Sequence, residues 1–191
     1  MVGRREHRHD TLRALSSAAC ELFEQKGVAA TLEEIAQRAG VSRRTVFRYV
    51  DHKEDLAFLH PRIWLDVFSD AMAEMPDAAV RERMLHGARR ISEHIDRDPL
   101  PVRQAMSVAQ VTPALAKGNA AVQQLWIERL TAELLGDQVD GDEFRAHILA
   151  GAVMGVINAA MIDWYRSPDA TRLVDLVGRG LDIIDPILEY P

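Results

Sequence analysis

Residues 31 to 49 restrict the fold more than any other part of the chain, and they read TLEEIAQRAGVSRRTVFRY. Thr31 followed three residues later by Glu34 is the capping box that begins many helices. Gly40 then offers a residue that adopts positive φ without strain, and Ser42 is a good N-cap for another helix. The pattern predicts one helix, a tight glycine turn and a second short helix that ends near Tyr49.

Small and apolar residues in this segment predict how the two helices lock together. Ala36 is small enough to stand where the helices cross, and Val41 and Val46 are expected to hold the second helix against the first, with Ile35 and Ala39 beneath. The sequence therefore predicts a helix-turn-helix.

Charge is distributed unevenly around this motif. The chain has a net charge of -6, but residues 35–50 contain Arg38, Arg43, Arg44 and Arg48 and no acid. Residues 1–60 hold ten basic and nine acidic residues, against thirteen and twenty in residues 61–191. A basic head on an acidic body favours an approach to DNA with the head first. The alternative is a small helical subdomain with a solvated arginine face.

If the second helix enters the major groove, its exposed residues lie near the bases. An arginine that donates two hydrogen bonds to guanine contributes about 1–3 kcal/mol of discrimination. Hydroxyl groups at helix starts can hold phosphates. The predicted DNA-binding residues are Thr31, Ser42, Arg43, Arg44, Thr45, Arg48, Tyr49 and Lys53.

The remaining sequence also predicts helices, because apolar residues recur at helical spacing and no stretch alternates as a strand does. A first helix is expected from Asp10 as N-cap to Gly27 as C-cap, and a long fourth helix from Asp51 to Met75 with a kink near Pro61. Further helices are predicted near residues 78–96, 102–110, 114–135, 142–166 and 169–189, with a loop from Gly136 to Gly141. The expected fold is all-α with about nine helices, divided into a DNA-binding domain (1–52) and a helical ligand-binding and dimerisation domain (53–191).

From about Leu12 to Leu56 the chain resembles the TetR family of regulators. The resemblance rests on ALSSAACELFEQKG, on EEIAQRAGVSRRTVFRY, and on the Lys53-Glu54-Asp55-Leu56 element that follows. It implies a homodimer that reads a palindromic operator, a ligand pocket in the body, and repression relieved by the ligand. Two departures are visible: the loop from Gly27 to Thr31 is about one residue short, and Val50 replaces an aromatic residue.

The last two predicted helices suggest a dimer interface. The segment GAVMGVINAAMIDWY is apolar nearly all round, so such a helix must be buried, here by core on one side and a partner on the other. Two such helices from each subunit would form a two-fold four-helix bundle. The alternative is that both helices serve only the monomer core. The candidate interface residues are Gly151, Gly155, Ala159, Leu173, Leu176, Val177, Leu181 and Ile184.

A small-molecule pocket needs apolar walls and a few polar groups. The candidate lining is Met106, Trp126, Met154 and Asn158, with His86, Arg103 and His147 as polar partners. Each could equally be ordinary core. The amide of Asn158 must find a partner, which could also be a backbone carbonyl across the dimer.

Other classes of protein are disfavoured. The sequence lacks the H-E-x-x-H, G-x-S-x-G and phosphate-loop motifs, so we expect no enzyme, no metal and no cofactor. His7 and His9 beside Asp10 fit a solvated arm or a phosphate contact better than a metal site. The alternative within DNA-binding proteins is a regulator that is controlled by a protein partner, or that acts as an activator.

The sequence also predicts a compartment. A single cysteine, Cys20, excludes an internal disulfide and suits a reducing cytosol, where we expect it to be inert core rather than a redox sensor. No unbroken apolar run reaches the ~18 residues that span a membrane, and the first residues do not resemble a secretory signal. We therefore expect a cytoplasmic protein that does not enter membranes.

Overall fold

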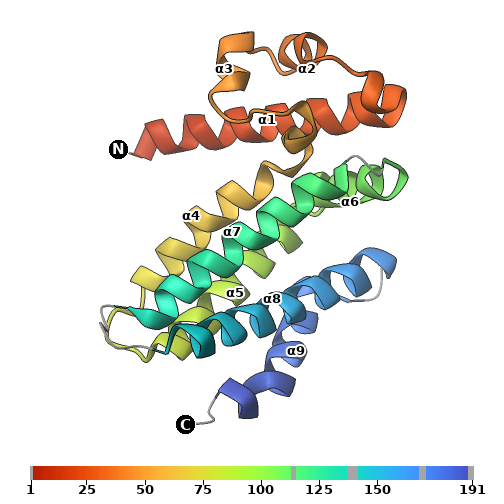
Figure 1. The fold of residues 1–191 in the computed structure, drawn as a ribbon. Helices are drawn as coiled ribbons and strands as arrows, with labels where there is room; N and C mark the ends of the chain where they lie inside the picture. Colours follow the sequence, from red (N-terminus) through yellow and green to blue (C-terminus); the bar gives the residue numbers. More distant parts are fainter. Residues whose placement is uncertain (1, 113–114, 137–141, 168–170, 189–191) are drawn as a thin grey trace. The chain divides into compact units, whose positions relative to one another are not determined.

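The computed structural model of the protein describes residues 2–112, 115–136, 142–167 and 171–188, and its regular structure is helical (Figure 1). Over those ranges no residue lies in a strand, so the all-α prediction is confirmed. The elements in chain order are α1 (Val2–Lys26), η1 (Gly27–Ala29), α2 (Leu32–Arg38), α3 (Arg43–Phe47), η2 (Lys53–Phe58), α4 (His60–Ala73), α5 (Val80–Arg97), α6 (Leu100–Val111), α7 (Ala116–Leu135), α8 (Glu143–Arg166) and α9 (Leu173–Leu188).

The chain divides into two compact units. The first contains Met1–Trp64 and Pro99–Val122, and the second contains Leu65–Asp98 and Gln123–Pro191. This division follows packing, because α6 lies against α1 in the first unit. The functional division into residues 1–52 and 53–191 stays a prediction.

The first helix begins earlier than the sequence predicts. It starts at Val2, so the prediction of Asp10 as its N-cap is wrong. Thr11 lies within the helix, where its hydroxyl donates to the carbonyl of His7 at 2.9 Å, and Asp10 pairs with Arg13 at 3.2 Å across one turn. The charged residues before Leu12 carry no apolar periodicity, yet they extend the helix that the apolar face begins.

The core of the first unit forms where α1 meets the short helices. Each of its large apolar side chains contributes about 1.5–3 kcal/mol when fully buried. Gly27 ends α1 with a φ of 55° and turns the chain toward α2. The largest fully buried members are Leu12, Leu15, Phe23, Ile35, Val46, Leu56, Leu59, Ile63 and Leu115, and Val50 is buried with them.

The predicted fourth helix is wrong as one continuous element. The structure has the 3-10 segment η2 and then α4, which begins at His60. Pro61 lies in the first turn of α4, where its missing N–H costs nothing, so it helps to start a helix rather than to kink one. Ser16 ties this junction to α1: its hydroxyl donates to the carbonyl of Ala57 at 3.1 Å and lies 2.9 Å from Nδ1 of His60.

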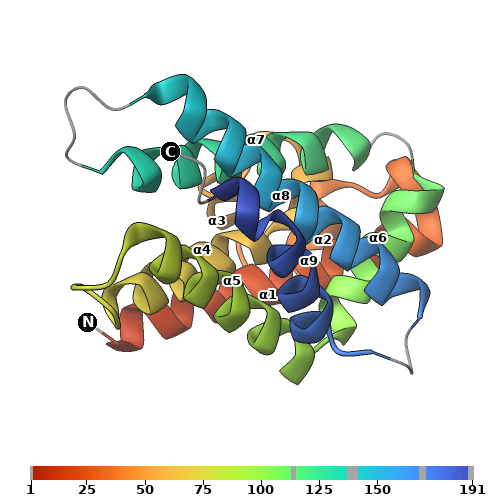
Figure 2. The same ribbon diagram turned by 90° about the horizontal axis from the view of Figure 1, so that it is seen from below.

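In the second unit α9 lies beside α8 and also packs against α5 (Figure 2). Asp96 of α5 accepts the backbone N–H groups of Leu173 and Val174 at 2.8 and 3.0 Å, which caps the start of α9. Phe68 and Trp126 meet edge to face with ring centroids 5.7 Å apart. These contacts join helices that are distant in the sequence.

Helix α8 is long and apolar enough to cross a membrane, judged by length and composition alone, and no other helix among the described residues is. The core helix of a soluble protein can have the same length and composition. Charged residues at both ends of α8 and Asn158 within it keep its apolar run below ~18 residues, so this finding does not contradict the expectation about unbroken apolar runs.

The other predicted helices begin and end within a few residues of α5, α6, α7, α8 and α9. Of the predicted loop, residues 137–141 lie outside the described residues, as does the beginning of the last predicted helix.

Candidate nucleic-acid interface

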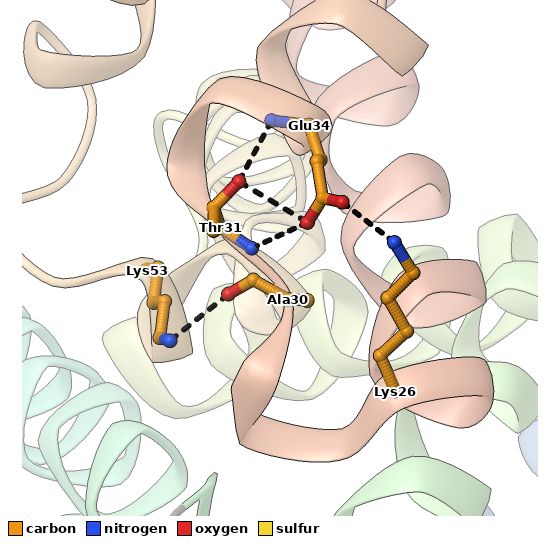
Figure 3. A network of polar contacts seen from close by, with 5 residues as sticks. All are labelled: Lys26, Ala30, Thr31, Glu34 and Lys53. Atoms are coloured by element: carbon orange, nitrogen blue, oxygen red, sulfur yellow. Dashed lines mark hydrogen bonds and ion pairs between the residues drawn. The ribbon is translucent and has the colours of Figure 1, made fainter.

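The start of α2 contains the predicted capping box (Figure 3). The hydroxyl oxygen of Thr31 accepts the N–H of Glu34 at 3.2 Å, and the N–H of Thr31 donates to Oε2 of Glu34 at 2.9 Å. Two N–H groups that the helix leaves unpaired are thus satisfied. The prediction is confirmed, and it fixes the direction in which the chain enters α2.

The same carboxylate joins α2 to the end of α1. Lys26 donates from Nζ to Oε1 of Glu34 at 2.6 Å. This hydrogen bond, followed by those from Thr31, lowers the pKa of Glu34 to about 2. The carboxylate therefore stays ionised over the whole physiological range, and the contact does not depend on pH there.

Lys53 holds the loop before α2. Its ammonium donates to the carbonyl oxygens of Val28 and Ala30 at 2.5 and 2.9 Å, and Figure 3 draws the second of these bonds. Lys53 thus fixes the loop that leads to Thr31. Its contact with DNA stays a prediction.

The turn between α2 and α3 has the geometry that its residues predict. Gly40 has a φ of 68°, and the N–H of Val41 donates to the carbonyl of Ala36 at 3.0 Å. Ser42 caps α3, because its Oγ accepts the N–H of Thr45 at 3.1 Å. The two hydroxyl groups of Ser42 and Thr45 lie 2.9 Å apart.

Burial determines which side of α3 faces outward. Val46 is fully buried, and Val41 and Tyr49 are partly buried against the same core. The outward residues of α3 and its C-cap are exposed: Arg43, Arg44, Phe47 and Arg48. The short α3 therefore presents a basic surface from a tightly packed base.

Two of the four arginines are paired with acids from other helices. Arg38 lies 2.6 Å from Glu21 of α1, and Arg43 lies 2.6 Å from Glu33 of α2. Residues 35–50 contain no acid in the sequence, but the fold brings Glu21 and Glu33 from other helices next to two of the arginines of this segment.

The other two arginines differ from each other. Arg48 stacks over the ring of Tyr49, with 5.1 Å from its guanidinium carbon to the ring centroid, and donates to the tyrosine hydroxyl at 3.3 Å. No partner of Arg44 is found within the described part of the chain. Arg44 is therefore the arginine of α3 that is most available to a ligand.

Phe47 is a further exposed residue of α3 that is not among the DNA-binding residues predicted from the sequence. This side chain is 49% exposed, although phenylalanine is usually buried. Its ring lies under Arg43, with the guanidinium carbon 5.3 Å from the ring centroid. The four-residue spacing from Arg43 is the signal that could have identified it.

The predicted pocket residues have different surroundings. Trp126 and Met154 are buried in the second unit, where Asn158 is half-buried and accepts a long hydrogen bond from Gln123 at 3.5 Å. His86 contacts Glu74 at 2.8 Å, and this bond lowers the pKa of the glutamate. His147 is exposed, and Met106 and Arg103 are half-buried in the first unit. Their contact with a ligand stays a prediction.

The residues predicted to form the dimer interface differ in how deeply they are buried. In the second unit Leu173, Val177 and Leu181 are buried by the chain's own packing. Gly155 and Ala159 are exposed, and Gly151, Leu176 and Ile184 are half-buried. The same two helices also carry exposed apolar residues that are not among the predicted interface residues: Phe144, Ile148, Ile162 and Ile183.

The candidate metal ligands and the cysteine were also located in the structure. Among the described residues no group of three or more His, Cys, Asp or Glu side chains could hold a metal ion. Burial raises the pKa of the Cys20 thiol to about 12, so the thiol is protonated and unreactive.

Comparisons with known proteins agree with this geometry. The family of bacterial regulatory proteins named tetR matches residues 15–58, and the MftR C-terminal domain matches residues 74–189. A protein of Mycobacterium tuberculosis (strain ATCC 25618 / H37Rv), described as "Putative mycofactocin biosynthesis transcriptional regulator MftR", is 26% identical over 194 residues, covering 96% of this chain and 92% of that protein.

Two solved structures share the fold. The fatty acid degradation regulator FadR of Bacillus halodurans has a TM-score of 0.58 and 16% identity, over 95% of this chain and 97% of that one. FadR of Thermus thermophilus, a TetR family repressor solved with lauroyl-CoA, has a TM-score of 0.51 and 17% identity, over 94% and 96%. At these identities the two likenesses establish the fold alone.

Proposed function

Since the chain belongs to the TetR family of bacterial transcriptional regulators, we propose that it is a repressor that binds a palindromic operator as a homodimer and is released by a small apolar ligand. The observation that carries this proposal is the outward basic face of α3 on a rigid helix-turn-helix. As a regulator that must reach the chromosome, it acts in the cytoplasm and needs no catalytic group.

The capped and buried side of α3 supports its role as the recognition helix. Ser42 and Val46 hold the helix in place, so its exposed side chains can meet DNA without first becoming ordered. Arg44 has the reach and the five N–H donors to bind guanine or phosphate. Thr31 and Ser42 stand at helix starts, where phosphate oxygens are favoured.

An exposed apolar stripe supports the homodimer. One face of α8 is buried within the chain, and its members are Ala146, Ala150, Val153, Ala160 and Trp164. The residues of the opposite face recur every three or four positions and are exposed apart from the half-buried Gly151; they are Phe144, Ile148, Gly151, Gly155, Ala159 and Ile162. An apolar helix face of this kind needs a partner, and a second copy of the same helix fits the two-fold symmetry of a palindrome.

The buried apolar residues of the second unit support a ligand site. Trp126 and Met154 offer apolar surface, and the amide of Asn158 supplies a polar group on the same helix as Met154. Thermus thermophilus FadR, which shares the fold, was solved with lauroyl-CoA. Only the lauroyl chain of that molecule is apolar, since its coenzyme A group is charged, so lauroyl-CoA is the first compound to test and coenzyme A without the chain is its control.

DNA binding is tested with purified Arg44→Ala and Thr45→Ala variants on the inverted repeat that the wild-type protein selects. Arg44→Ala is expected to weaken binding by about 1–3 kcal/mol per half-site at matched salt, because arginine can make a bidentate contact. Thr45→Ala should weaken binding by less, and the circular dichroism and dimer mass of both variants should be unchanged. Arg89→Ala removes an exposed arginine from α5 and is the charge-matched control. If both α3 variants bind this DNA as wild type does, the proposal that the outward basic face of α3 contacts the bases is refuted.

Ligand release is tested by adding lauroyl-CoA, and then a panel of apolar compounds, to the complex with DNA. The proposal expects one of them to release the wild-type protein, and Asn158→Leu to blunt the response without changing DNA affinity. If no compound releases it, control by a protein partner, or activation without an inducer, replaces the small-molecule proposal.

A further inference from the structure

We propose that Arg43 and Phe47 act as one reading unit, in which Arg43 binds a guanine and Phe47 contacts the C5 methyl of a neighbouring thymine. The inference rests on the proposed function and specifies the base sequence that α3 recognises. The operator half-site therefore contains a thymine whose methyl group contributes to affinity through Phe47.

Contacts within the first unit hold the two side chains together. They stand four residues apart on α3, and the guanidinium carbon of Arg43 lies 5.3 Å from the centroid of the Phe47 ring. Nη1 of Arg43 also lies 2.6 Å from Oε1 of Glu33. An arginine held by both a carboxylate and an aromatic ring has a defined direction, so it loses little side-chain entropy on binding.

The exposure of Phe47 has no explanation in the packing of the protein alone. The ring is 49% exposed, and the neighbouring Val46 fills the core instead. An exposed aromatic ring contributes little to folding, but it offers apolar surface to whatever α3 meets.

The major groove provides one apolar group, the C5 methyl of thymine, and phenylalanine is among the side chains that contact it. Arginine is the residue that binds guanine O6 and N7 most often. The ion pair with Glu33 uses Nη1, and a guanidinium carries five N–H donors, so an edge remains for guanine.

Spacing indicates that the two bases are close neighbours. Base pairs are stacked roughly 3.4 Å apart. The 5.3 Å between the guanidinium carbon and the ring centroid lies between one and two of these steps. The two groups can therefore be separated by at most between one and two base-pair steps along the DNA, which is compatible with neighbouring base pairs.

Replacement of single thymines by deoxyuridine tests the methyl contact, because it removes only the methyl group. On the selected operator, one such position in a single half-site should weaken wild-type binding about four-fold, and the equivalent positions in both half-sites together about 15-fold. Phe47→Ala should bind the thymine and deoxyuridine operators equally. Val111→Ala, which removes an exposed apolar side chain from α6, should behave as wild type.

Replacement of guanine by 7-deazaguanine tests the arginine contact, because it removes the N7 acceptor. Phe47→Leu keeps an apolar side chain but loses the ring face, so it should still distinguish thymine from deoxyuridine while the effect of 7-deazaguanine becomes smaller. Circular dichroism of each variant should match that of wild type, because the exposed ring supports little of the core.

The outcomes separate the two proposals. If the wild-type protein selects no DNA sequence, both are overturned. If it selects an inverted repeat but no deoxyuridine position weakens binding, or if Phe47→Ala is equally sensitive to the substitution, the reading unit is overturned and the proposed function stands. A selected half-site without thymine also overturns the reading unit.

Discussion

Replacement of Asp96 by alanine removes the acceptor of two backbone N–H groups at the start of α9. The carboxylate accepts from Leu173 at 2.8 Å and from Val174 at 3.0 Å, and it lies 3.8 Å from Nε of Arg172. Its side chain is only 8% exposed, so water cannot easily replace it. The contact joins α5 to a helix that lies 77 residues further along the chain.

The expected loss follows from these two bonds. A hydrogen bond to a charged acceptor contributes about 1.5–3 kcal/mol, and loss of an aspartate N-cap costs about 0.5–2 kcal/mol. Because both bonds share one carboxylate, we do not add them, and we expect Asp96→Ala to reduce the free energy of unfolding by about 2–4 kcal/mol. Asp96→Asn keeps one oxygen acceptor, so its loss should be about half as large.

Urea unfolding followed by circular dichroism, at one fixed protein concentration, measures these losses. Asp10→Ala is the matched control, since the Asp10 side chain is 72% exposed and lies 3.2 Å from Arg13 within α1. That control should change the unfolding free energy by less than about 0.5 kcal/mol. If Asp96→Ala loses no more than Asp10→Ala, the capping of α9 by α5 is not a stabilising contact.

Three further predictions concern packing, pH and assembly. Gly87→Ala should destabilise the second unit by about 1–3 kcal/mol and alter tryptophan fluorescence, because its Cβ would lie 2.5 Å from the Phe68 ring; unchanged unfolding would refute this. Because the pKa of Glu34 is lowered, its carboxylate contributes stability at pH values above its ordinary pKa of 4.5, and this stability is lost as the pH falls toward 2. In Glu34→Gln the free energy of unfolding by urea should therefore depend less on pH between 4.5 and 2, and an unchanged pH dependence would contradict this. Gly155→Leu should weaken the dimer in sedimentation without harming the fold, since nothing lies within 4 Å of its Cβ; Gly155→Ala is the milder control, and an intact dimer in the leucine variant would place the interface elsewhere.

Local signals in the sequence predicted the local structure of the helix-turn-helix. The capping box of Thr31, the cap at Ser42 and the turn at Gly40 each depend on hydrogen bonds or backbone angles within a few residues. These caps and turns can therefore be predicted from a few neighbouring residues, without knowing how the rest of the chain folds.

Contacts between distant residues could not be predicted in the same way. The acids that pair with Arg38 and Arg43 belong to other helices, and only the folded chain brings Glu21 and Glu33 beside them. The same holds for Asp96 at the start of α9. The early start of α1 was missed because its first residues are charged and carry no apolar period.

The most direct test of the central claim is selection of random duplex DNA with the purified wild-type protein and with Arg44→Ala in parallel. If α3 reads the operator, wild type should enrich an inverted repeat with half-sites about one helical turn or more apart, and Arg44→Ala should lose or change a base preference within each half-site. Enrichment of no sequence, or of the same inverted repeat with equal strength by both proteins, would contradict the assignment of α3 as the reading helix.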